Sequence, residues 1–227
     1  MDQSLVLGQA EMPLFKGICC LLSAERAGEL TMVMADEEGR LEAEPLMTTE
    51  ELMRTIELRR LTRLALHIEL HRLDRTTLPI YQGREQLMAG AAALLDEDAS
   101  LECQDAMWLL ALQLDKLLRS GNCSQQFKLD GLTLTALESR ALAAQSPNSS
   151  SVVRGSWRRK TRNQLGHASW LDVVEAALWC FWHSDDLRSG EVLLGVLLEA
   201  DFRVYLIYSM LAGAFYFADV TTVSVNY

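Results

Sequence analysis

The fold is decided by residues 172–217, which read DVVEAALWCFWHSDDLRSGEVLLGVLLEADFRVYLIYSMLAGAFYF. Apolar residues recur there at helical spacing in three runs, at residues 171–182, 192–198 and 204–217. Between the first two runs, the polar residues 183–186 (HSDD) are typical of a turn or a helix N-cap. Small side chains in the last run leave room for another helix to approach closely; they are Ser209, Ala212, Gly213 and Ala214. The stretch therefore predicts apolar helices that pack against one another.

The composition of the whole chain favours helices around one core. The 227 residues are 49% hydrophobic and 23% charged, which is ordinary for a globular protein. Only four prolines interrupt long runs of Leu, Ala, Met, Glu and Arg, which are good helix formers. A chain of this length can bury a full core, so we expect a single all-α domain over residues 1–227.

The formal net charge of −10 bears on the partners of the chain. It argues against binding to nucleic acid or to an anionic membrane, and it suits a basic partner protein. The one basic segment, residues 154–162, contains Trp157 and no acidic residue. Such a segment can bind phosphate, but in an acidic chain it is more typical of a surface loop or of an internal ion-pairing strap.

The cysteines and the first residues indicate a compartment. The cysteines are odd in number and scattered, without the CxxC or Cys/His spacing of a zinc site, which indicates reduced thiols and predicts a cytoplasmic protein. The first residues lack the basic and apolar regions of a signal peptide. The longest apolar run, residues 204–217, is shorter than the roughly 20 residues that span a bilayer. The cysteines are Cys19, Cys20, Cys103, Cys123 and Cys180.

Five more helices are expected before this stretch. The longest begins at residues 48–51 (TTEE), where hydroxyl and acidic side chains suit a first turn, and continues to about Asp74. Its apolar stripe is expected at Leu52, Ile56, Leu61, Leu64, Ile68 and Leu73. The other helices are expected over residues 15–24, 86–95, 100–118 and 132–144, with a turn at residues 76–83.

Two histidines lie four residues apart on the longest expected helix. This HxxxH spacing places His67 and His71 on one helix face, where such a pair can bind zinc. Because no third ligand lies nearby in the sequence, we expect surface or interface histidines instead.

Two blocks of the C-terminal stretch match a known signature. Residues 175–181 read EAALWCF, and residues 211–216 read LAGAFY. In these blocks the chain resembles the ADP-ribosylglycohydrolase family, whose C-terminal helices read roughly E-A-A-L-W-x-F and L-A-G-A-Y-Y-G. Gly17 can begin a match to the first helix of that family. The resemblance implies a compact, all-α, multi-helix ADP-ribosylglycohydrolase-like bundle.

The same resemblance gives the positions where the family holds its metal ions. An ungapped alignment places the family motif D-A-D-T on residues 200–203, which read Ala-Asp-Phe-Arg. On the longest helix, the two acidic positions of T-D-D-T fall on Arg60 and Leu61. Hard divalent cations need clustered anionic oxygens, so the resemblance implies no metal site, no cofactor and no catalytic residue. Arg203 can then occupy the place of a metal ion and pair with a remaining acid.

A function follows from the resemblance and from the charge. Members of the family act opposite ADP-ribosyltransferases, and some bacterial relatives protect cells against ADP-ribosylating toxins. The resemblance implies a non-catalytic immunity protein that binds and occludes a basic protein toxin, an ADP-ribosyltransferase. Acidic residues are the candidate contacts with that toxin: Asp96, Glu97, Asp98, Asp185 and Asp186.

Two other functions stay open. An alignment shifted by one residue places Glu199 and Asp201 on acidic positions of the motif, where they would hold Mg²⁺ in an active ADP-ribosyl hydrolase. A chain without the metal site can also be a pseudoenzyme that binds ADP-ribose and does not turn it over.

Overall fold

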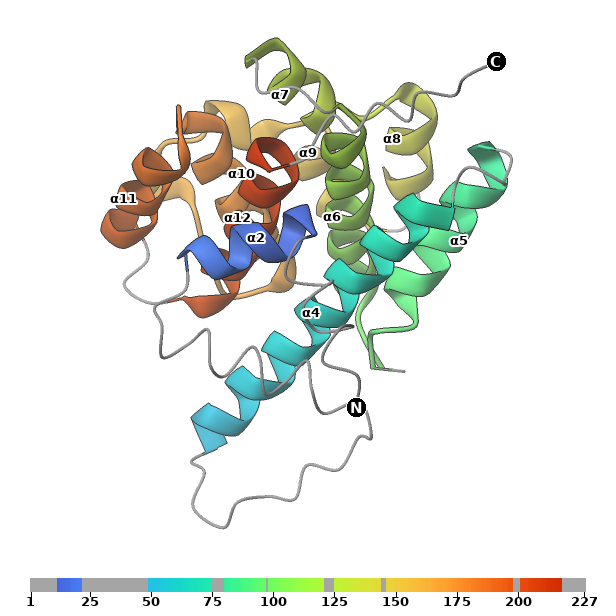
Figure 1. Ribbon diagram of the computed structural model, residues 1–227, viewed down its shortest axis with the longest axis horizontal. Coiled ribbons are helices and arrows are strands. Elements are labelled where there is room, and N and C mark those ends of the chain that lie inside the picture. The colour runs from blue at the N-terminus through green and yellow to red at the C-terminus, as the bar shows by residue number, and fades with distance from the viewer. Residues whose placement is uncertain are drawn as a thin grey trace.

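The computed structural model describes residues 12–21, 49–74, 80–96, 98–120, 125–143, 146–197 and 201–217. Within these residues every regular element is a helix and no strand occurs, which confirms the all-α prediction (Figure 1). The α-helices are α2 (Pro13–Leu21), α4 (Thr49–Asp74), α5 (Ile80–Ala92), α6 (Leu101–Ser120), α7 (Gln125–Leu132), α8 (Ala136–Ala143), α9 (Ser149–Val153), α10 (Trp170–His183), α11 (Leu187–Leu197) and α12 (Phe202–Tyr216). Two 3₁₀-helices, η2 (Ser156–Arg159) and η3 (Arg162–Gln164), lie between α9 and α10.

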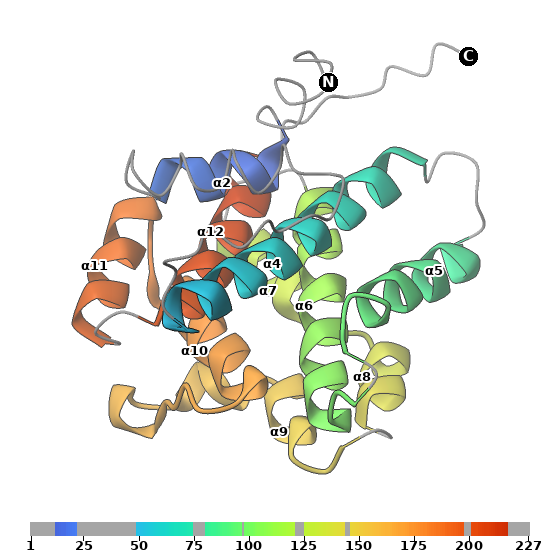
Figure 2. The ribbon, with the colours of Figure 1, turned by 90° about the horizontal axis from the view of Figure 1, so that it is seen from below.

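Helix α6 is the centre of the arrangement. It contacts helices from both halves of the chain, namely α4, α5, α7, α8, α9, α10 and α12, and the other helices surround it in two views (Figures 1 and 2). Its predicted stripe is confirmed, because Met107, Leu110, Leu114 and Leu117 are fully buried. None of the described helices has the length and apolar character needed to cross a membrane.

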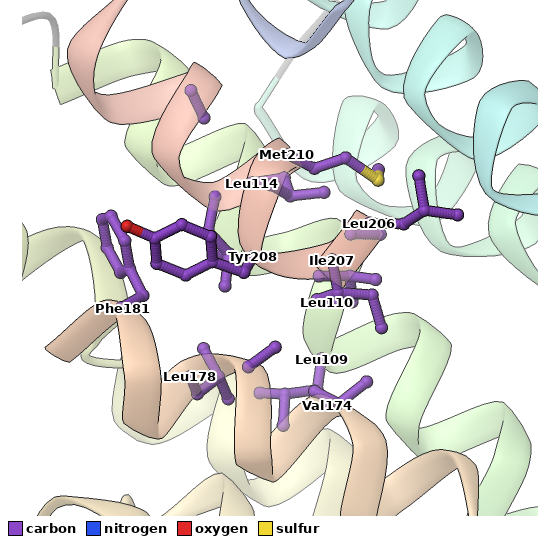
Figure 3. Close-up of a cluster of buried hydrophobic side chains, with 14 of the residues drawn as sticks. Leu109, Leu110, Leu114, Val174, Leu178, Phe181, Leu206, Ile207, Tyr208 and Met210 are labelled. Carbon is purple, nitrogen blue, oxygen red and sulfur yellow. The ribbon is translucent and has the colours of Figure 1, made fainter. Parts of the chain in front are cut away.

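The core forms where α6, α10 and α12 meet. One cluster of buried side chains contains Leu110 and Leu114 of α6, Val174 and Leu178 of α10, and side chains of α12 such as Ile207 (Figure 3). Aromatic rings extend this cluster at one end, where Phe181 makes edge-to-face contacts with Tyr208, Phe215 and Tyr216. The apolar runs quoted from the sequence therefore supply two of the three helices in the centre of the core.

Helix α2 packs directly on α12, and glycines make this contact possible. A Cβ atom added to Gly17 would lie 2.1 Å from the carbonyl oxygen of Ser209 and 2.5 Å from the Cα atom of Gly213. A Cβ atom on Gly213 would lie 2.4 Å from the carbonyl oxygen of Pro13. Real Cβ atoms do not approach backbone atoms so closely, so both positions require glycine. The close approach predicted from the small residues of the last run is confirmed.

The first turn of α2 is capped by a residue from a distant helix. Pro13 suits the first position of a helix, where a missing N–H costs nothing. The next N–H, from Leu14, donates to Oε1 of Glu69 at 3.0 Å, and Glu69 is fully buried on α4. Helix α4 thus satisfies a buried donor that α2 cannot satisfy within its own backbone.

Short polar segments begin α10 and α11. Ser169 and Asp172 form a reciprocal capping box at the start of α10. At the start of α11, Oδ1 of Asp186 accepts a hydrogen bond from the backbone N–H of Ser189 at 2.7 Å. The hydroxyl of Ser189 in turn accepts from the backbone N–H of Asp186 at 3.0 Å. The turn and N-cap are therefore confirmed at residues 184–186, whereas His183 is the last residue of α10.

Several predicted boundaries are wrong. Helix α5 begins at Ile80, so residues 80–83 are helical rather than part of a turn, and α7 was not predicted. Helix α8 begins at Ala136 rather than at residue 132, and α11 begins at Leu187 rather than at residue 192. On α4 the stripe holds at Leu61, Leu64 and Ile68, but Ile56 is 37% exposed. The side chains of Leu52 and Leu73 lie outside what the structure describes.

Candidate functional site

The candidate site is centred on Arg203 at the start of α12. Asp201 is the N-cap residue of this helix, and its Oδ1 accepts hydrogen bonds from the backbone N–H of Arg203 at 3.0 Å and from Nε at 3.2 Å. Oδ2 of Asp201 accepts from Nη2 of Arg203 at 2.9 Å. The guanidinium therefore binds both carboxylate oxygens of its own helix cap, a two-point pairing that suits arginine.

Three more residues from other segments meet the same guanidinium. His167, in the segment before α10, accepts from Nη2 through its carbonyl oxygen at 2.8 Å, and its Nδ1 lies 3.3 Å from Oδ2 of Asp201. Oε1 of Glu57 on α4 lies 3.7 Å from Nη1. The ring of Trp170 lies 5.7 Å from Cζ. Arg203 thus joins α4, the start of α10 and the start of α12.

The pKa values in this cluster depend on burial and on Arg203. The side chains of Glu57 and Arg203 are 19% and 21% exposed, and that of Asp201 is 10% exposed. Burial raises the pKa of Glu57, although the positive charge of Arg203 opposes this shift. Burial also acts to raise the pKa of Asp201, but hydrogen bonds and charge from Arg203 outweigh it and leave that pKa below its usual value. Hydrogen bonding to Asp201 raises the pKa of Arg203, so the pair is ionised at neutral pH.

These residues do not fit a hard divalent cation. Both carboxylate oxygens of Asp201 are taken by Arg203, and a guanidinium lies between Asp201 and Glu57 where a shared metal ion would have to lie. Within the described part of the chain, no group of three or more His, Cys, Asp and Glu side chains is arranged to hold a metal ion. Glu199, the other ligand under the shifted alignment, lies outside the described residues.

The other motif positions on α4 also hold no ligand. Arg60 donates to Oδ2 of Asp96 at 2.7 Å, and Leu61 is buried in the core. Burial raises the pKa of Glu57, and the positive charge of Arg60 opposes that rise together with Arg203. Arg60 and Leu61 therefore contribute positive charge and apolar packing.

The acidic residues predicted to contact a partner fall into two separate groups. Asp96 and Asp98 follow α5 and are exposed, with Asp96 paired to Arg60. Asp185 and Asp186 lie between α10 and α11 and are also exposed. Among the described residues no hydrogen bond or ion pair joins the two groups, and Glu97 lies outside those residues. Asp186 also has the structural role of capping α11.

The basic segment is anchored to α10 from the inside. Nζ of Lys160 lies 2.6 Å from Oε2 of the buried Glu175, whose Oε1 accepts from the hydroxyl of Ser156 at 3.0 Å. The indole N–H of Trp179 donates to the carbonyl oxygen of Lys160 at 2.8 Å. The guanidinium of Arg158 lies 4.6 Å from the ring centre of Trp157. Lys160 therefore forms the internal ion pair expected of a strap, whereas Arg154, Arg159 and Arg162 of the same segment are exposed.

Three residues of interest were not identified from the sequence, and a fourth is more deeply buried than expected. Glu57 and His167 join the Arg203 cluster from distant segments, and no local pattern points to either one. Lys128 of α7 is fully buried, and its Nζ donates to the carbonyl oxygen of Ser184 at 2.6 Å. His71, expected at a surface or interface, is only 8% exposed.

The chain was compared with models of protein families, with curated proteins and with solved structures. None of the three comparisons finds a match. The functional argument therefore depends on the residues of the chain itself.

Proposed function

We propose that this chain is a non-catalytic, ADP-ribosylglycohydrolase-like protein that binds a basic ADP-ribosyltransferase toxin and blocks it by occlusion. The observation that carries the proposal is the position of Arg203, which neutralises Asp201 and Glu57 where the resemblance locates a metal site. Metal-dependent hydrolysis needs free carboxylates to hold the ion, and here an arginine neutralises them. The arrangement therefore favours a protein that acts by binding its partner.

The charge of the chain supports a basic partner. The net charge is −10, and Lys160 of the basic segment is neutralised internally by Glu175. Exposed acids remain at two places, after α5 and between α10 and α11. Complementary charge of this kind speeds association and makes the rate depend on salt.

Two tests separate this function from the alternatives. Calorimetric titration with Mg²⁺ and with ADP-ribose should give no binding heat for an occluding inhibitor. Mg²⁺ binding would support a hydrolase that uses Glu199 and Asp201, and binding of ADP-ribose alone would support the pseudoenzyme.

The inhibitor itself is tested with a panel of bacterial ADP-ribosyltransferases, starting with any encoded beside this chain. We expect one transferase to form a stable complex and to lose activity in proportion to the chain added. In the complex, Asp96→Asn with Asp98→Asn, or Asp185→Asn with Asp186→Asn, should slow association, and Arg159→Gln serves as the control on the exposed basic side. If no transferase is bound or inhibited, the proposal is wrong.

A further inference from the structure

Helix α4 carries a pair of histidines that the Arg203 cluster does not use. His67 and His71 lie one helical turn apart, and their ring centres are 6.4 Å apart with the rings tilted by 42°. His71 is 8% exposed, and neither of its ring nitrogens has a hydrogen-bond partner. A buried polar group without a partner is destabilising by about 1–3 kcal/mol, so its presence calls for an explanation such as an ion or a water molecule.

The second histidine is held by a contact with α5 that fixes its tautomer. Nε2 of His67 lies 3.3 Å from the carbonyl oxygen of Leu87 on α5. A carbonyl oxygen can only accept, so this contact requires a proton on Nε2 and leaves the lone pair on Nδ1. Histidine ligands of metal ions commonly donate their other ring N–H to a backbone carbonyl in this way.

A glycine on α5 makes room for this ring. A Cβ atom added to Gly90 would lie 2.1 Å from both Cε1 and Nε2 of His67. Glycine within a helix is unfavourable by roughly 1 kcal/mol relative to alanine, and the space needed by the imidazole accounts for its presence here.

We propose that His67 and His71 form a binding site for a borderline transition-metal cation such as Zn²⁺, Ni²⁺ or Cu²⁺, with water in the remaining coordination positions. Imidazole nitrogen suits these ions, whereas Mg²⁺ and Ca²⁺ prefer oxygen ligands. This inference does not depend on the proposed function, because neither histidine belongs to the Arg203 cluster.

The distance of 6.4 Å between the ring centres is at the upper limit for two rings that share one ion. A zinc–nitrogen bond of about 2.0–2.1 Å places the ion about 3.2 Å from each ring centre, so two rings on one ion can be at most about 6.4 Å apart. A tetrahedral angle requires a separation of roughly 5 Å between the ring centres, so the two rings must move closer together when an ion binds.

The test uses the full chain without an affinity tag and titrates it with Ni²⁺, Zn²⁺ or Mg²⁺ while thermal unfolding is monitored. We expect Ni²⁺ and Zn²⁺ to bind with one ion per chain and to raise Tm by about 5–10 °C at one hundred times the Kd, and Mg²⁺ to have no effect. His67→Gln and His71→Gln should each remove the shift, and His183→Gln, which changes an exposed histidine on α10, should keep it.

Two further measurements cover the case in which a histidine variant fails to fold. Gly90→Ala keeps both histidines but displaces the His67 ring, so it should weaken Ni²⁺ binding at least tenfold. Cu²⁺ bound to the unchanged chain should show nitrogen hyperfine coupling from imidazole in its electron paramagnetic resonance spectrum. The inference is overturned if the chain binds none of the three transition metals at millimolar concentration, if both histidine variants bind as well as the unchanged chain, or if bound Cu²⁺ has no imidazole ligand.

Discussion

Two contacts made by α12 differ in the kind of atoms that meet. At Gly213 the helix meets α2 through close contacts between backbone atoms, which involve Gly17 and Pro13. At Arg203 the same helix meets α4 through a charged group that binds Asp201 and faces Glu57. The first contact depends on shape and tolerates no added atom, whereas the second depends on charge and keeps some exposure to water. Substitutions should therefore affect the first contact more strongly than the second.

The largest effect is expected where α2 meets α12. Gly17→Ala adds a Cβ atom that would lie 2.1 Å from a backbone oxygen, so the helices must separate and the core beneath them must loosen. We expect a loss of about 3 kcal/mol or more in the free energy of unfolding, measured by urea denaturation. Gly195→Ala is the matched control, because nothing lies within 4 Å of its added Cβ atom, and it should stabilise the chain by about 0.5–1 kcal/mol. Equal effects at both glycines would show that the contact is not close-packed.

The second largest effect is expected from the buried ammonium group of Lys128, which should make the stability of the chain depend on pH. Lys128 is fully buried with Nζ 4.2 Å from the ring centre of Phe181, and burial lowers its pKa to about 8 against the opposing charge of Asp185. The unfolded chain binds the proton of Lys128 more tightly than the folded chain does. The free energy of unfolding should therefore rise with pH between about 8 and 10.5, and Lys128 should cause no pH dependence below about pH 8.

Lys128→Met should remove that dependence. The difference in unfolding free energy between the unchanged chain and the variant should change by about 2–3 kcal/mol across the window from pH 8 to 10.5. Urea denaturation of both chains at a series of pH values measures this change. A constant difference across the window would contradict the low pKa.

The Arg203 contact should be weaker than the glycine contact. Arg203→Met leaves Asp201 and Glu57 without their shared positive charge, and we expect a loss of about 1–2 kcal/mol because both groups keep some contact with water. Urea denaturation measures the loss, and Arg159→Met, an exposed arginine of η2, should change stability by less than about 0.5 kcal/mol. A larger loss than that of Gly17→Ala would reverse the comparison.

The smallest effect is expected at an exposed helix cap. Asp186→Ala removes the acceptor for the backbone N–H of Ser189 and should lower Tm by roughly 2–4 °C, whereas Asp185→Ala should lower it less. Asp186→Asn keeps a capping oxygen and should restore most of the loss in a thermal unfolding experiment. Equal Tm values for the Ala and Asn variants would argue against the capping role.

The difference between the two α12 contacts also explains which parts of the fold could be predicted from the sequence. Apolar periodicity gave α6, α10 and α12, since a buried stripe repeats within one helix and needs no knowledge of its neighbours. It did not give α7, where the buried face includes Lys128 and the glycine Gly131, neither of which is typical of a core stripe. Helix α5 began earlier than predicted because Gly83, which suggested a turn, is buried within the helix.

Polar contacts were predicted only where both partners are close in sequence. The pairing of Arg203 with a remaining acid was expected, and Asp201 lies two residues away. Glu57 and His167 approach the same guanidinium through the packing of α4 and of the segment before α10, which no local pattern reports. The burial of His71 has the same origin, because its surroundings come from helices that pack on α4.

The contact between Gly17 and Gly213 joins the first and the last helices that the structure describes. During synthesis on the ribosome, α2 is made long before the helix that it packs against. Until then Leu14, Phe15 and Ile18, all buried in the finished protein, lack that cover and are open to chaperones or to other chains. The core can therefore be completed only after α12 has been synthesised. A chain truncated before this helix would expose the apolar side chains of α2 and would be prone to aggregate.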